Sequence, residues 1–174
     1  MTRLRAALTA LVLTATVLLS GCAQTPDTTA VVNGVVIRER NVEEMAQALV
    51  STGAVASYRD ARLSAARELI GGEVAREVAR KEGISLAPAD IATLASTYPA
   101  YAPFLSTAIG REFATDNANA VQVSSTDSDW ATKFAALPVQ LNPRYGSWLD
   151  YVADLASPAG SPAPTGSLSV ASGS

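Results

Sequence analysis

The stretch from Tyr58 to Ile91 constrains the fold more than any other part of the chain, because it has the pattern of one long helix. Its apolar residues recur at steps of three and four, the spacing that lays side chains along one helical face. These residues are Leu63, Ala66, Ile70, Val74 and Val78. We therefore expect Ile70 and Val74 to be buried, and the charged residues between them to form a solvated outer face.

The end of this helix is marked by its own residues. Arg80 and Lys81 precede Gly83, as is usual where cations meet the negative end of the helix dipole and the chain turns left-handed. The helix should stop at Glu82. We expect Pro88 to occupy the first position of the next helix, with Asp90 near its positive end.

Gly71 and Gly72 interrupt the long helix at its centre. Two glycines inside a helix cost about 1 kcal/mol each relative to alanine. The sequence leaves two interpretations open, a tolerated kink or the close approach of another part of the chain.

Composition narrows the functional classes. A chain of 174 residues has room for one domain, and much of its 48% hydrophobic content is alanine, which predicts a thin core. The formal net charge is -3, and removal of Arg3 and Arg5 with a leader would leave 11 basic against 16 acidic residues, or about -5. An acidic chain without a clustered basic footprint argues against nucleic acid binding.

The chain has no histidine and one cysteine, so imidazole bases, histidine metal ligands and intramolecular disulfides are excluded by composition. It also lacks a glycine-rich phosphate loop, a nucleophile elbow and carboxylates at metal spacing. We therefore expect no enzyme activity, no catalytic residue, no cofactor and no metal.

Residues 1–21 have the organisation of a bacterial leader: a basic start, an apolar run from Ala6 to Leu19, and then Cys22. The run is too short to span a bilayer comfortably. Leu19-Ser20-Gly21-Cys22 resembles a lipobox, which implies that Cys22 is acylated and anchors the mature protein to the outer face of the cell membrane. The alternative is an ordinary secretory signal with a chance cysteine.

The mature chain begins with a polar stretch, residues 22–29, that we expect to be a tether. Asn33-Gly34 then lies between two β-branched runs and predicts a turn. A helix is expected from about Glu39 to Leu49, although Arg38 offers no capping oxygen. We also expect Val31–Val32 and Val139–Leu141 to pair antiparallel, since a lone strand would leave its backbone groups unpaired.

An aromatic stripe at helical spacing follows, and such stripes lie more often in cores than on binding surfaces. It comprises Tyr98, Tyr101, Phe104, Leu105, Ala108, Ile109 and Phe113. Thr126 is expected to cap a helix from Asp127 to Ala136 by accepting the amide of Asp129. The Pro-, Ala-, Gly- and Ser-rich residues 157–174 are expected to be disordered.

Residues 30–94 resemble the N-terminal chaperone domain of SurA-type and PrsA-type foldases. The resemblance rests on the order of short motifs: Val31-Val32-Asn33-Gly34 with Ile37 and Val42, Glu68-Leu69-Ile70, and Ala79-Arg80-Lys81-Glu82-Gly83-Ile84. The run Asn142-Pro143-Arg144-Tyr145-Gly146-Ser147-Trp148 resembles a segment of some Gram-positive foldase-like lipoproteins, and its expected role is a proline turn with an aromatic clamp. The resemblance implies a mainly helical SurA N-terminal-like domain over residues 30–150, with a small two-stranded antiparallel pairing.

Two hypotheses about function follow from the resemblance and the leader. The first is a membrane-anchored chaperone that binds unfolded or secreted polypeptides without ATP, through an apolar groove. If their stripe is exposed, Tyr98, Tyr101, Phe104 and Phe113 would form the contact surface. Such a chain would slow client aggregation without prolyl isomerase activity, because it has no room for a parvulin domain. The second is an accessory envelope lipoprotein with one specific protein partner, which should present a flatter, more polar patch.

Overall fold

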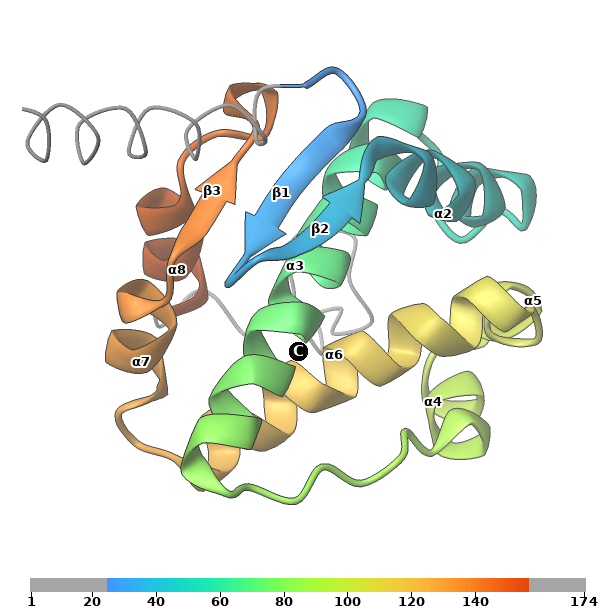
Figure 1. The fold of residues 1–174 in the computed structure, drawn as a ribbon. Coiled ribbons are helices and arrows are strands. Elements are labelled where there is room, and N and C mark those ends of the chain that lie inside the picture. Colours follow the sequence, from blue (N-terminus) through green and yellow to red (C-terminus); the bar gives the residue numbers. More distant parts are fainter. Residues whose placement is uncertain (1–24, 157–174) are drawn as a thin grey trace, which may run out of the picture.

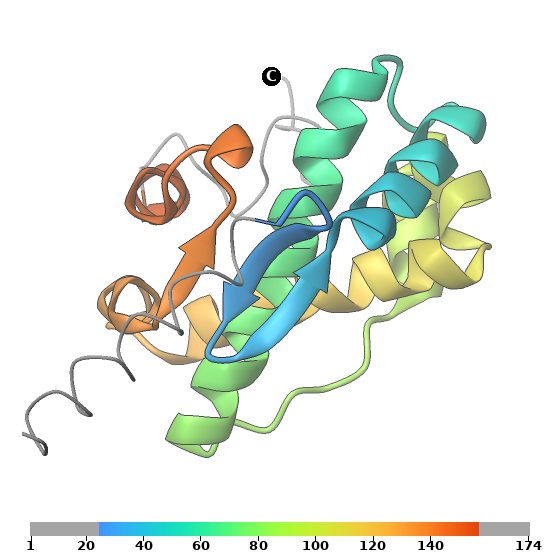
Figure 2. The same ribbon diagram turned by 45° about the horizontal axis from the view of Figure 1, so that its top comes forward.

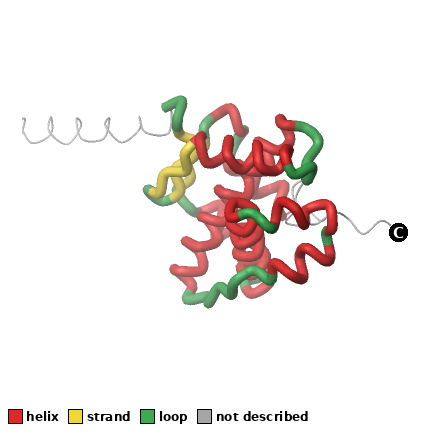
Figure 3. Tube along the Cα trace, turned by 90° about the vertical axis from the view of Figure 1, so that its right-hand side faces the viewer, coloured by secondary structure: helices red, strands yellow, loops and turns green. Residues whose placement is uncertain are grey.

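The computed structural model describes residues 25–156 as a mainly helical body with a small antiparallel sheet at one edge (Figures 1 and 3). The strands are β1 (Thr28–Val32), β2 (Val35–Arg38) and β3 (Val139–Leu141). The helices are α2 (Glu39–Ser51), α3 (Tyr58–Glu82), α4 (Ile91–Thr97), α5 (Ala102–Leu105), α6 (Ala108–Thr126), α7 (Trp130–Ala136) and α8 (Trp148–Ala156), with 3-10 turns η2 (Pro99–Tyr101) and η3 (Pro143–Tyr145). Residues 1–24, which contain the expected leader and Cys22, and residues 157–174 lie outside the described residues.

Helix α3 is the centre of the molecule, as its sequence pattern predicts. Ser57 caps its start, and Gly83 ends it with a left-handed φ of 68°. Ile70 and Val74 are buried, as expected. The helix packs most extensively against α6 and α2, while the sheet and α7 cover another side (Figures 1 and 2).

The expectation of one apolar stripe and a solvated outer face on α3 is too simple. Neighbours on several sides also bury Ala65, Ala75 and the carboxylate-bearing Glu68 and Glu77. Glu77 pairs with Arg80 and Lys81 as the spacing suggests, and it also accepts a 2.7 Å hydrogen bond from Asn33 Nδ2 in the hairpin turn. The polar residues of α3 therefore connect it to neighbouring elements as well as to solvent.

The predicted pairing of Val31–Val32 with residues 139–141 is confirmed: β1 and β3 are antiparallel, with Val31 opposite Gln140. The sheet has three strands rather than two, in the order β2-β1-β3, because the run after Asn33-Gly34 folds back on β1. Both turn residues have positive φ, 46° and 89°, as a tight hairpin requires. Strand β1 starts at Thr28, so Thr28 and Thr29 are buried in the sheet and do not belong to a tether.

Three other local expectations need correction. Helix α4 starts at Ile91 and is capped by Asp90, whose Oδ1 accepts the Thr93 amide at 3.0 Å, so Pro88 lies before the helix. Thr126 is the last residue of α6 and caps nothing. Asp127 Oδ1 instead accepts the Asp129 amide at 2.9 Å, and α7 begins only at Trp130.

The glycine pair in α3 marks the close approach of other helices, and α3 continues through it without a break. A Cβ on Gly71 would lie 2.6 Å from the hydroxyl oxygen of Tyr151 in α8. A Cβ on Gly72 would collide with the side chain of Asp116 in α6. The two glycines therefore let side chains of two different helices reach the surface of α3.

Candidate functional site

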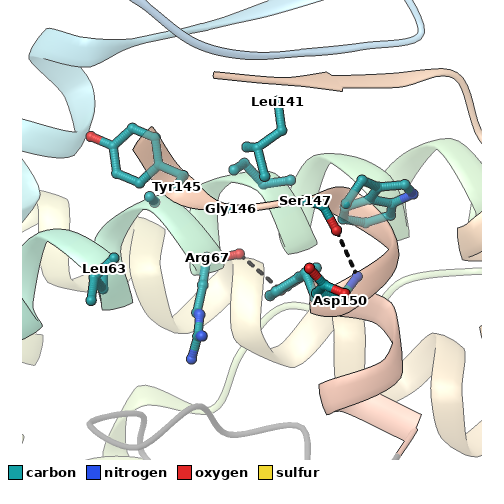
Figure 4. Close-up of a pocket in the computed structure, with 11 residues that line it drawn as sticks. Leu63, Arg67, Leu141, Tyr145, Gly146, Ser147 and Asp150 are labelled. Atoms are coloured by element: carbon teal, nitrogen blue, oxygen red, sulfur yellow. Dashed lines mark hydrogen bonds between the residues drawn. The ribbon is translucent and has the colours of Figure 1, made fainter. Parts of the chain in front are cut away.

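A cavity of about 150 Å³ lies between the first half of α3 and the segment that follows β3 (Figure 4). Helix α3 contributes Leu63, Ala66, Arg67 and Ile70. The opposite wall is formed by Leu141, Tyr145, Gly146, Ser147, Trp148, Asp150 and Tyr151. The lining is mixed, with aliphatic and aromatic surface beside a few polar groups, which is the usual character of a ligand-binding cavity.

The aromatic wall of this first cavity is held in place by hydrogen bonds. Trp148 Nε1 donates to the Phe134 carbonyl oxygen at 3.2 Å, and the Tyr151 hydroxyl donates to the Arg67 carbonyl oxygen at 3.0 Å. The two rings lie 5.2 Å apart. Ser147 Oγ accepts the Asp150 amide at 3.1 Å at the start of α8 (Figure 4). The wall is thus fixed before any ligand binds.

A second cavity, of about 330 Å³, adjoins the first, because Leu63 and Tyr145 line both. Its remaining lining residues are Tyr58, Arg59, Arg62 and Arg144. Three guanidinium groups thus gather beside the apolar cavity, in a chain whose formal net charge is -3. The second cavity has a local charge opposite to that of the whole chain.

Glu39, at the start of α2, pairs with two of the arginines that line the second cavity. Its carboxylate pairs with Arg62 and accepts hydrogen bonds from the Tyr145 hydroxyl at 2.6 Å and from Thr29 Oγ1 at 2.9 Å. Arg144 Nη1 lies 3.6 Å from it. Burial alone would raise the pKa of Glu39, but the hydrogen bonds from Tyr145, Thr29 and Arg62 outweigh it and hold that pKa below its ordinary value. The carboxylate is therefore ionised near neutral pH.

The aromatic residues that the sequence offers as a contact surface lie elsewhere. Tyr101, Phe104 and Phe113 are buried in the core, and the rings of Phe104 and Phe113 pack edge to face at 5.4 Å. Tyr98 is half-buried against the same core. The core interpretation is confirmed for Tyr101, Phe104 and Phe113. Their expected role as a polypeptide-binding surface depended on exposure of the stripe, and these side chains do not meet that condition.

Sequence reasoning did not identify the residues around the two cavities as a site. The aromatic clamp expected in the Asn142–Trp148 run is the one signal that pointed there. Residues 25–156 contain no group of three or more carboxylates, thiols or imidazoles placed to hold a metal. No helix within that range is long and apolar enough to cross a membrane. The predicted lipidation site, Cys22, lies outside the described residues.

Comparison with protein families, with characterised proteins and with solved structures found no match to this chain.

Proposed function

We propose that this chain is a membrane-anchored, extracytoplasmic lipoprotein that binds polypeptide and catalyses no reaction. The leader and its lipobox resemblance support the anchor and the location. The observation that carries the binding function is the pair of adjoining cavities, one lined largely by apolar side chains and one by three arginines. Such a pair suits a ligand with apolar and polar groups in sequence, as polypeptides have.

The size of the site favours recognition of one specific protein partner over general holding of unfolded chains. An apolar cavity of about 150 Å³ takes a group about as large as benzene, which corresponds to a single side chain. A general holdase needs a broad contiguous apolar surface. The large hydrophobic residues exposed within residues 25–156 are instead spread over β2, α3, α6 and α8: Val35, Val36, Tyr58, Val121 and Leu149. We infer that the accessory-lipoprotein function fits this geometry better.

The order of the strands and helices along the chain is a separate observation in favour of the chaperone-like function. A strand hairpin and a short helix precede a long helix that ends at a basic corner with Gly83 and Ile84, as the resemblance to SurA-type domains implies. This observation concerns arrangement alone. It favours an evolutionary origin among foldase-like domains, from which a specific binder and a general holdase could equally descend.

An array of peptides that tile secreted and envelope proteins tests the proposal. A specific binder should retain a small subset of peptides, and Leu63→Asp should abolish that binding because Leu63 lines both cavities. Val121→Asp is the matched control, since it places the same charge at an exposed apolar residue on α6. Absence of binding to any peptide would overturn the proposal.

An aggregation assay then distinguishes a general holdase from an accessory factor with one specific partner. A reduced, unfolded secreted protein is diluted into buffer without ATP in the presence of the full chain. Broad peptide binding together with suppressed aggregation would favour the holdase. Selective binding without suppression at several-fold molar excess would favour the accessory factor.

A further inference from the structure

The arginines of the second cavity favour a particular charge in any ligand that also occupies the first cavity. Leu63 and Tyr145 are shared, so a ligand that fills the apolar cavity and continues past these two side chains enters the arginine-lined one. Because the two cavities share these lining residues, side chains that lie close together in one extended peptide can reach both cavities.

The three arginines of the second cavity differ in how many of their interactions are made within the chain. Arg62 pairs with Glu39 and lies 3.8 Å from Glu43, and its guanidinium also sits 6.0 Å from the centre of the Tyr145 ring. Arg144 donates to the Pro26 carbonyl oxygen at 3.1 Å and approaches Glu39. Arg59 is exposed and forms no ion pair or hydrogen bond with any residue in the range 25–156. The cavity therefore has one cation available for a ligand.

The charges around the second cavity also favour an anionic ligand group. The nearby carboxylates, Glu39 and Glu43, face Arg62 and do not line the cavity. The lining itself contains guanidinium groups, tyrosines and one leucine, with no carboxylate. Guanidinium groups bind carboxylates through paired, charge-assisted hydrogen bonds. An anionic group entering the cavity would meet complementary charge without displacing an existing ion pair of Arg59.

We propose that the two cavities together bind an extended polypeptide segment in which an apolar or aromatic side chain is followed by an acidic one. The apolar side chain occupies the first cavity, beside Leu63, Ile70 and Trp148, and Arg59 binds the carboxylate in the second cavity. This inference rests on the proposed polypeptide-binding function and names the chemistry of its partner. Arg59 selects for the acidic residue. Leu63 contacts the peptide whether or not it carries that acidic residue.

Two fluorescent peptides test this with the full chain in detergent. Both have phenylalanine in a glycine–serine background, followed by glutamate in one and glutamine in the other. Binding is followed by fluorescence anisotropy up to about 1 mM protein, so that affinities as weak as about 1 mM are detected. We expect the glutamate peptide to bind more tightly, with an advantage that shrinks as salt is added, because exposed charges are screened.

Substitutions at Arg59 and Leu63 test which residue produces the preference for the glutamate peptide. Arg59→Glu should weaken the glutamate peptide about tenfold, because a favourable exposed pair is replaced by repulsion of similar size, and leave the glutamine peptide within about twofold. Arg40→Glu is the matched control, as Arg40 is also exposed and lines neither cavity. Leu63→Gln should weaken both peptides alike.

Equal affinity for the two peptides, unchanged by Arg59→Glu, would overturn this inference and leave polypeptide binding intact. Binding of neither peptide, while the peptide array still retains a subset of sequences, would likewise overturn the inference alone. If the array is also empty, the proposed function itself fails.

Discussion

At the scale of single residues, Asp116 is a carboxylate buried between α3 and α6 with only one of its two oxygens paired by the described part of the chain. The residue is 1% exposed, its Oδ1 accepts a hydrogen bond from Arg76, and its Oδ2 has no partner among residues 25–156. Burial raises the pKa of Asp116 to about 6, and the nearby Arg76 only partly offsets that effect; Glu112 and Glu73 add to it. Gly72 provides the space that this carboxylate occupies.

Stability should therefore depend on pH through Asp116. Because its pKa is raised in the folded chain, the folded state binds the proton more tightly, so stability from this group is greatest below about pH 4 and falls as pH rises to about 6. The shift corresponds to about 3 kcal/mol. Asp116→Asn should remove this loss, which urea unfolding at pH 4 and pH 7 measures. Asp129→Asn, at an exposed position, is the control. An unchanged difference between the two pH values in Asp116→Asn would refute the assignment.

Gly71 gives a second prediction at this scale. Gly71→Ala should destabilise the fold by about 1 to 3 kcal/mol, because the new methyl group would lie 2.6 Å from the Tyr151 hydroxyl oxygen, which its hydrogen bond to the Arg67 carbonyl oxygen holds in place. In a Tyr151→Phe background the next ring atom is 3.8 Å away, and the same substitution should stabilise by up to about 1 kcal/mol through helix propensity. Thermal melts of the four proteins complete the double-mutant cycle. Additive effects would show that the two residues do not meet.

At the scale of elements, α3 is the support on which the other helices and the candidate site are built. Ile70 is 4% exposed and also lines the first cavity, so it serves the core and the site together. Ile70→Ala should cost about 1 to 4 kcal/mol through lost transfer free energy and an enlarged cavity. Unchanged thermal melts would contradict the burial of this face.

The elements also show which features a sequence can predict. The extent of α3 and its end at Gly83 follow from patterns within a few residues, so they were predictable. Asp116 meets Arg76 across 40 positions, and Glu39 meets Tyr145 across 106. No local pattern encodes such pairs. The candidate site escaped prediction for the same reason, since its walls come from α3 and from the segment after β3.

At the scale of the whole molecule, pairing of β1 with β3 joins the two ends of the domain. Asn142 Nδ2 donates to the Thr28 carbonyl oxygen at 2.9 Å and extends this join beyond the sheet. The expected two-stranded pairing of Val31–Val32 with Val139–Leu141 left out the third strand, β2. The Asn33-Gly34 turn between β-branched runs was a sufficient signal for a hairpin.

The attachment of the whole molecule to a membrane is a separate prediction at this scale. Cys22→Ala should release the protein from membranes, because the acylated cysteine would supply the lipid chains that hold it there. Detergent partitioning of the variant and the unaltered chain measures the effect. Identical partitioning would contradict acylation at Cys22.

Site-resolved NMR of the full chain in detergent tests whether polypeptide binds in the paired cavities on α3. A peptide retained by the array is titrated into isotope-labelled protein, and amide shifts are followed throughout residues 25–156. Binding in the paired cavities should give saturable shifts at Arg59, Leu63, Tyr145 and Trp148 that are lost in Leu63→Asp. Shifts centred instead on the exposed edge of β2 or on Val121 of α6 would contradict it.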